Sequence, residues 1–248
     1  AGDGALSIGL NAGTDVTDAA GNPVTPSGLL SSAIDIDNTL PEATAILPST
    51  TGPTNTGTVV FTVEFSEPMF NTFAQENDLV IVHNGTAHGG VAFNEVAPGE
   101  YEITLDGLVG DGWFTLAVST ASDVQDFAGN LLAASVTSAP VYLDNTPPNV
   151  IAVTPSTTGP TNADDIAFTV TFDEDVANFD DAGDVSVGHS GTAHTGVAIA
   201  PVTGDEYTVT VQGVTGDGLF DLEVNSGTGV TDVAGNPLLA TQSSDAVH

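Results

Sequence analysis

The chain has 248 residues, of which 33 are Asp or Glu and none is Lys, Arg or Cys, and its formal net charge is −33 at pH 7. Repulsion of this size must be relieved by salt or by bound cations, and it makes nucleic acid and anionic membranes poor partners. The lack of Cys excludes a disulfide framework, and the absence of an apolar run of spanning length argues against direct membrane insertion. Hydrophobic residues make up 40% of the chain, which is enough for a folded core.

An internal repeat with a period of about 107 residues organises the chain. Pro48–Asn55 recurs as Pro155–Asn162, and Asp37 recurs at the same spacing as Asp144. The period divides the chain into a partial repeat that matches only the C-terminal strands of the unit, followed by two whole repeats. These are residues 1–38, residues 39–145 (repeat 1) and residues 146–248 (repeat 2).

Each whole repeat has the pattern of β-structure throughout. Residues alternate along Thr58–Phe65, so that Phe61 and Val63 share a face predicted to be buried, and Ala167–Phe172 is its copy. Further strands are predicted between Gly, Pro, Asn and Asp residues at Asp78–His83, Gly90–Val96, Glu100–Leu105, Trp113–Ser119 and Ser135–Leu143. About seven short strands per repeat predict an all-β fold: tandem immunoglobulin-like (Ig-like) antiparallel β-sandwiches joined end to end by short linkers.

Two short phrases recur at the repeat boundaries. Asp-x-Ala-Gly-Asn begins at Asp18, Asp126 and Asp232, and Asp-Asn-Thr begins at Asp37 and Asp144. In an Ig-like sandwich the start of the first strand lies at the same end as the B–C loop and the F–G loop. Acids from three distant segments should therefore meet there, and without cationic side chains they suit a hard cation such as Ca²⁺, which takes about six to eight oxygen ligands.

The sequence thus predicts calcium ions at the junctions between repeats. The first site is expected to contain Asp37, Glu67 and Asp126, with help from Asp123. The second is expected to contain Asp144, Glu174 and Asp232, with Asp173 or Asp175 as auxiliary ligands. A third, incomplete site would contain Asp15 and Asp18. For any single Asp a hydrogen-bonded turn is the simpler explanation, so the prediction depends on the recurrence of three converging acids.

The motifs also resemble a known family. Phe65-Ser66-Glu67 with its copy Phe172-Asp173-Glu174, the Asp-x-Ala-Gly-Asn phrase and the (Leu/Ile)-Asp-Asn-Thr phrase are similar to the bacterial Ig-like domains arrayed in very large surface adhesins, in particular the extender regions of RTX-type adhesins. The resemblance covers nearly the whole chain. It implies calcium-rigidified spacers whose ligand binding is confined to terminal modules.

Other candidate sites have weaker support. Two histidine pairs and two Gly-Asp-Gly segments recur, and we expect ordinary loop contacts and turns at His83 with His88, His189 with His194, Gly110–Gly112 and Gly216–Gly218. The sole Trp, Trp113, is expected in the core because its strand alternates. No enzyme is predicted, since the sequence lacks a Cys nucleophile, a Ser-His-Asp arrangement and a phosphate-binding glycine loop.

We therefore expect a structural segment of an extracellular repetitive adhesin or surface filament, either on the cell surface or secreted. Its partners would be neighbouring Ig-like repeats and, in an assembly, other copies of the same chain. Two alternatives stay open. A second chain could complete the partial repeat 1–38 by strand addition and build a filament. The repeats could also be polysaccharide-binding accessory modules of a secreted enzyme.

Overall fold

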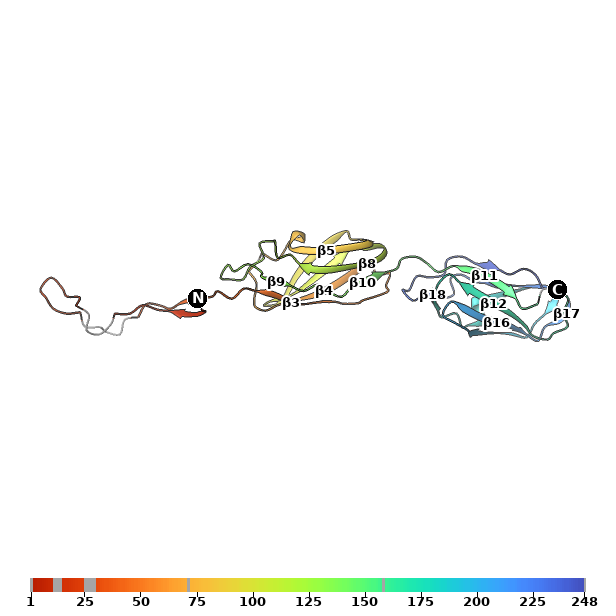
Figure 1. Cartoon of the computed structure of the whole chain (residues 1–248). Helices are drawn as coiled ribbons and strands as arrows, with labels where there is room; N and C mark the ends of the chain where they lie inside the picture. Colours follow the sequence, from red (N-terminus) through yellow and green to blue (C-terminus); the bar gives the residue numbers. More distant parts are fainter. Residues whose placement is uncertain (1, 11–14, 25–29, 71, 158, 248) are drawn as a thin grey trace.

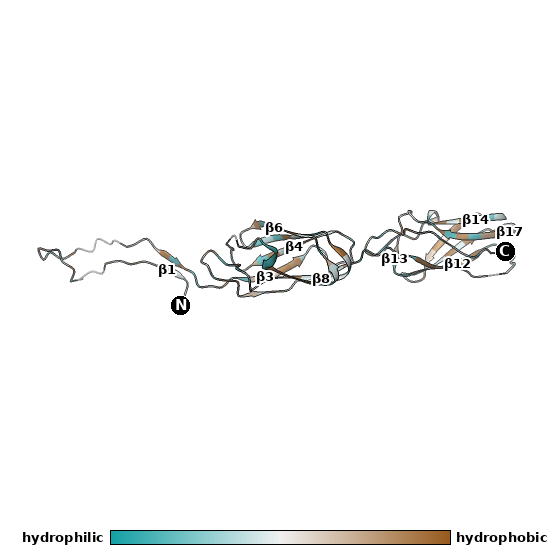
Figure 2. Cartoon of the chain, turned by 90° about the horizontal axis from the view of Figure 1, so that it is seen from above, coloured by the Kyte–Doolittle hydropathy of each residue, from teal (hydrophilic) through white to brown (hydrophobic). Residues whose placement is uncertain are grey.

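The computed structural model describes residues 2–10, 15–24, 30–70, 72–157 and 159–247. An N-terminal hairpin, repeat 1 and repeat 2 follow one another along a single line (Figures 1 and 2). The regular elements of the described residues are β-strands, apart from two 3-10 helices of three residues each. In that described part, no helix has the length and apolar character that a membrane crossing needs. The fold is all-β, as predicted.

The N-terminal hairpin corresponds to the C-terminal edge of a sandwich. It pairs β1 (Gly4–Leu6) with β2 (Ile34–Ile36), with Gly4 opposite Ile36. All six residues of these two strands are exposed. In repeat 1 the copies of these two residues, Gly112 and Leu143, are paired in the same way.

Repeat 1 is a sandwich of two sheets. The larger sheet has the order β6 (Gly90–Ala97), β7 (Glu100–Asp106), β4 (Thr58–Phe65), β3 (Glu42–Pro48) and β9 (Ala134–Ser135). The facing sheet has the order β10 (Val141–Leu143), β8 (Val109–Val118) and β5 (Leu79–Ala87), and β5 follows the 3-10 helix η1 (Glu76–Asp78). Pairing is antiparallel except between β3 and β9, which run parallel. This is the arrangement of an Ig-like sandwich.

The alternation of apolar and polar residues in the sequence matches the alternation of buried and exposed side chains in the structure. On β4, the side chains of Phe61 and Val63 are fully buried, whereas Glu64 is exposed. Phe61 contacts Phe114 of the opposite sheet edge-to-face, with ring centroids 6.0 Å apart. Large apolar side chains from both sheets thus form the core, which holds the repeat without a disulfide.

Repeat 2 copies this architecture around a second, separate core. One sheet has the order β11 (Val150–Pro155), β12 (Ile166–Phe172), β16 (Glu206–Gln212) and β15 (Gly196–Pro201). The facing sheet has the order β14 (Val185–Ala193), β17 (Thr215–Val224) and β19 (Gln242–Ser243), and β14 follows η2 (Ala182–Asp184). The short strands β13 (Val176–Ala177) and β18 (Thr231–Asp232) pair where the B–C loop meets the F–G loop.

The structure corrects two expectations. The predicted strand Ser135–Leu143 is two short strands, β9 and β10, because Ser135 and Ser138 use their side-chain oxygens to accept backbone N–H groups of β8. Pro140 follows, and it has no N–H to donate to a ladder. Trp113 is half-buried rather than in the core, and the next residue, Phe114, takes the fully buried position.

Candidate metal centres

The Asp-x-Ala-Gly-Asn loop holds its first acid at the centre of a hydrogen-bonded turn. Asp126 is 2% exposed, and its Oδ1 accepts the backbone N–H groups of Ala128 at 2.8 Å and Asn130 at 2.9 Å. The Asn130 amide donates to Asp126 Oδ2 at 2.8 Å, and Gly129 adopts a positive φ of 93° that suits glycine. The turn fixes both oxygens of Asp126 without using all of their lone pairs.

The last residue of the phrase also joins this loop to the linker. The Asn130 side-chain amide donates to the backbone carbonyl of Asp37 at 3.2 Å, and the Asn236 amide donates to that of Asp144 at 2.9 Å. Asn236 makes the same turn bonds to its own acid, Asp232, at 2.7 Å. This bridging role was missed from the sequence, where the only signal was the recurrence of Asn at the end of each phrase.

A second acid clamps each linker from the preceding sandwich edge. Asp111 accepts the Asn145 backbone N–H at 2.6 Å on Oδ1 and the Thr146 hydroxyl at 2.9 Å on Oδ2. Asp3 of the hairpin does the same for the first linker, with distances of 2.7 and 2.6 Å. The Gly-Asp-Gly segment, which was expected to be a turn, instead lies in β8, because the positive φ of Gly110 and Gly112 lets the backbone pass close to β5 at a register shift. Its acid fixes the direction in which the linker leaves.

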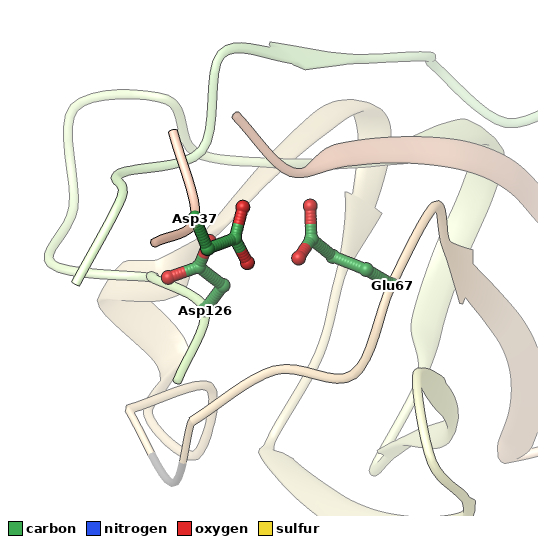
Figure 3. A group of neighbouring side chains, drawn as sticks. All are labelled: Asp37, Glu67 and Asp126. Carbon is green, nitrogen blue, oxygen red and sulfur yellow. The ribbon is translucent and has the colours of Figure 1, made fainter. Parts of the chain in front are cut away.

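The carboxylates of Asp37, Glu67 and Asp126 come together at the first junction (Figure 3). Each offers one oxygen, and these three oxygens lie within 4.8 Å of one another. Asp37 comes from the linker, Glu67 from the loop after β4 and Asp126 from the loop after β8. Segments far apart in sequence thus converge as the topology predicted.

The second junction repeats this cluster with Asp144, Glu174 and Asp232, again within 4.8 Å. Two oxygens on opposite sides of one Ca²⁺ ion are about 4.6–5.2 Å apart, since each bond measures about 2.3–2.6 Å. The spacing therefore suits a single hard cation. Lys and Arg do not occur in the sequence, so no such side chain can take the place of a metal.

Burial and mutual repulsion oppose ionisation of the glutamate in each cluster. Glu67 Oε1 is buried, with no hydrogen-bond partner among the residues that the structure describes. Burial, followed by the charges of Asp126 and Asp37, raises the pKa of Glu67. Burial, followed by the charges of Asp144 and Asp232, raises the pKa of Glu174 to about 7. A cation at the first cluster would satisfy the unpartnered Glu67 oxygen, and at either cluster it would offset the repulsion between the carboxylates.

The aspartate of the loop behaves in the opposite way. Burial opposes ionisation of Asp126, but the hydrogen bonds from Asn130 and Ala128 outweigh it and lower its pKa. The first junction thus combines an acid held in its charged form, Asp126, with one that releases its proton less readily, Glu67. Binding of a cation is expected to displace that proton.

Five of the predicted ligands lie outside the two clusters. The Asp173 carboxylate accepts the backbone N–H and the side-chain amide of Asn149 at 2.7 and 3.0 Å, although its charge still acts on Glu174. The Asp175 carboxylate lies against Gly204, outside the cluster. The exposed residues that complete this set are Asp123, Asp15 and Asp18.

Asp18 forms the turn of its phrase but meets no acid cluster in the described part of the chain. Its Oδ1 accepts the backbone N–H groups of Ala20 and Asn22 at 2.9 Å. For this copy the structure shows the turn alone.

The histidine pairs form contacts with each other. His83 Nε2 lies 2.9 Å from His88 Nδ1, and His189 Nε2 lies 2.7 Å from His194 Nδ1. In repeat 1, His88 also approaches Glu76 at 3.3 Å. His83 and His189 lie in β5 and β14, and each also contacts the Thr three residues later, so both pairs make local polar contacts.

No family model and no curated protein matches the sequence. Among solved structures, the chain resembles FdeC, an adhesin of Escherichia coli (12% identity, TM-score 0.39), InvD of Yersinia pseudotuberculosis (17%, 0.34) and invasin, a bacterial integrin-binding protein (15%, 0.37). The alignments cover 82%, 82% and 89% of this chain, but only 62%, 56% and 43% of those chains. These neighbours are bacterial Ig-like adhesin domains, and at such low identity the likeness concerns the fold alone.

Proposed function

We propose that this protein is a structural extender segment of an extracellular repetitive adhesin or surface filament, and that Ca²⁺ stiffens its junctions. The observation that carries the proposal is the repetition of one three-carboxylate cluster at both junctions of a chain without Lys or Arg. The sequence motifs shared with adhesin extender repeats support the extracellular assignment. Extracellular modules bind calcium with dissociation constants of about 10⁻⁴–10⁻³ M, which matches millimolar surroundings.

Each ion would cross-link the linker to two loops of the following repeat. Without a cation, only hydrogen bonds hold the linker, namely those to the Asp111 carboxylate and that from Asn236 to the Asp144 carbonyl. The carboxylates of Asp144, Glu174 and Asp232 then repel one another. With a cation, the repulsion becomes attraction to one centre. The junction then resists bending, and a string of sandwiches acts as a rod.

A calcium titration by calorimetry tests this function. The chain is expected to bind two ions, and Glu67→Gln and Glu174→Gln are each expected to leave one. Asp123→Asn is the matched control, because it removes an exposed acid close in sequence to Asp126 but outside the cluster. Absence of binding at 10 mM calcium, or equal effects of all three variants, would refute the assignment.

A further inference from the structure

A loop of residues 49–57 lies at the end of repeat 1 that faces repeat 2. Its backbone follows β10, the strand by which the chain leaves repeat 1. The Tyr142 N–H donates to the Thr51 carbonyl at 3.0 Å, and the Thr54 N–H donates to the Tyr142 carbonyl at 3.1 Å. A Cβ at Gly52 would clash with this Tyr142 carbonyl, so the loop passes very close to the strand. The loop is thus fixed to the segment that leads into the second metal centre.

The same loop holds the linker ligand of that centre. The Asp144 N–H donates to the Thr54 carbonyl at 3.1 Å. The Asp144 carbonyl accepts the Asn236 side-chain amide at 2.9 Å. The backbone of Asp144 is therefore bonded to repeat 1 on one side and to repeat 2 on the other.

The next residue of the loop, Asn55, reaches repeat 2 directly. Its side-chain amide donates to Asn236 Oδ1 at 3.2 Å. A Cβ at Gly235 would lie 3.7 Å from Asn55 Nδ2, so the Asn55 side chain also lies against the glycine of the Asp-x-Ala-Gly-Asn turn. These two contacts connect the sandwiches without passing through the linker.

Asn55 completes the hydrogen bonds of the Asn236 side chain. The Asn236 amide nitrogen donates to the Asp144 carbonyl at 2.9 Å and to Asp232 Oδ2 at 2.7 Å. Its oxygen accepts from Asn55, and the residue is only 6% exposed. A side-chain amide is planar, so a donor at its oxygen also fixes the direction of its two N–H groups. Asn55 thus helps to aim Asn236 at two residues of the second centre.

We propose that Asn55 is a positioning residue for the second metal centre, and that it couples the occupancy of this centre to the stability of repeat 1. A cation that draws Asp144 and Asp232 together holds Asn236 where Asn55 can reach it. Binding of the ion therefore strengthens a contact that only a folded repeat 1 can make.

Thermodynamic linkage makes this coupling reciprocal. A folded repeat 1 raises the affinity of the second centre by the same factor by which the bound ion favours the folded form of repeat 1. The inference rests on the proposed calcium function. It extends the effect of this ion from the linker and the following repeat to the preceding repeat.

Repeat 2 offers a matched control for Asn55. Pro48–Asn55 recurs as Pro155–Asn162, and the side chains of Asn55 and Asn162 are both exposed. Among the residues that the structure describes, none forms a hydrogen bond with the Asn162 side chain. Asn162→Ala therefore makes the same chemical change as Asn55→Ala without touching a junction.

The test uses the full chain with Glu67→Gln, which removes a ligand of the first centre, so that calcium acts through the second. Trp113 is the sole Trp and lies opposite Tyr142, so its fluorescence reports thermal unfolding of repeat 1. Calcium is expected to raise this midpoint by about 3–8 °C, and Glu174→Gln should abolish the rise. Asn55→Ala should reduce the rise.

Calorimetry measures the reciprocal effect on the same proteins. Asn55→Ala is expected to weaken binding of the one remaining ion by about three- to tenfold, the range that one hydrogen bond provides. Asn162→Ala should leave both the affinity and the rise in midpoint unchanged. Since Asn55 is exposed, its replacement should alter the midpoint of repeat 1 in EDTA by less than it does in calcium.

Equal midpoint rises and equal affinities with and without Asn55→Ala would overturn the proposal. A rise that persists with Glu174→Gln would also overturn it, as would an equal loss from Asn55→Ala in EDTA and in calcium. If the Glu67→Gln chain binds no ion at 10 mM calcium, the proposed function fails and the coupling fails with it. If it binds one ion and Asn55→Ala has no effect, only this inference fails.

Discussion

Replacement of Glu174 by Gln is expected to change the stability of repeat 2 in opposite directions with and without calcium. In the metal-free protein the carboxylate of Glu174 repels Asp144 and Asp232, and its pKa is raised from the ordinary 4.5 to about 7. An acid whose pKa is higher in the folded state than in the unfolded state contributes to stability, and this contribution is fully present at pH values below the unfolded-state pKa. That contribution is lost as pH rises through the folded pKa.

The magnitude follows from the two pKa values. The difference between 4.5 and about 7 corresponds to about 3 kcal/mol at about 1.4 kcal/mol per pH unit, and screening at this half-exposed site reduces it to roughly 1–2 kcal/mol. In EDTA the parent repeat 2 should therefore lose about 1–2 kcal/mol between pH 4 and pH 8 from this group. Glu174→Gln cannot ionise, so it should avoid this loss and be the more stable form at pH 8.

Calcium reverses the order of the two proteins. At pH 8, an ion present at 100 times its dissociation constant stabilises the parent by about 2.7 kcal/mol. The Gln variant lacks one charged ligand and gains less. The difference in stability between Glu174→Gln and the parent should therefore change sign between EDTA and calcium. Such a reversal is expected for a metal ligand and not for an ordinary acidic residue.

Urea unfolding provides the measurement, because Trp113 is the sole Trp and reports on repeat 1 alone, while circular dichroism reports on both repeats. Asp245→Asn, at an exposed position of repeat 2, is the control for loss of one charge. The reasoning is refuted if Glu174→Gln destabilises repeat 2 in EDTA at pH 8, or if the variant and the parent respond equally to calcium.

Two further substitutions test how the junction and the sandwich edge are held. Asn236→Ala removes the donor to both Asp232 and the Asp144 carbonyl, so it should lower the unfolding free energy of repeat 2 by about 1–3 kcal/mol in EDTA; a change below about 0.5 kcal/mol would contradict the bridging role. Gly110→Ala places a Cβ 2.3 Å from a backbone oxygen at a φ of 86° and should destabilise repeat 1 by about 1–3 kcal/mol in urea unfolding followed by Trp fluorescence. Gly57→Ala, where a Cβ meets nothing within 4 Å, should be nearly neutral, and equal effects at the two glycines would count against this explanation.

The fold could be predicted because alternation and repetition are local properties of the sequence. The buried positions of Thr58–Phe65 follow from period-two patterning alone. The convergence of Asp37, Glu67 and Asp126 could also be predicted, because Ig-like topology brings those three segments to the same end. Whether the clusters bind calcium stays a prediction.

Other details depend on contacts that the sequence does not encode locally. Asp175 is adjacent to Glu174, but its carboxylate lies against Gly204 and outside the cluster, because the chain bends at residues 173–174. The clamp by Asp111 depends on the register between β8 and β10, which places Gly112 opposite Leu143. The Gly-Asp-Gly sequence is typical of a turn and gives no local sign of this strand pairing, so the sequence predicts neither the start of β8 at Val109 nor the clamp.

Small-angle X-ray scattering of the full chain with and without calcium tests the stiffening of the junctions most directly. In 10 mM calcium the scattering should fit one extended rod, and EDTA should broaden the distance distribution toward bent conformers. The double variant Glu67→Gln, Glu174→Gln should give the broadened profile under both conditions. Superimposable profiles of the parent chain in calcium and in EDTA would contradict calcium-dependent rigidity.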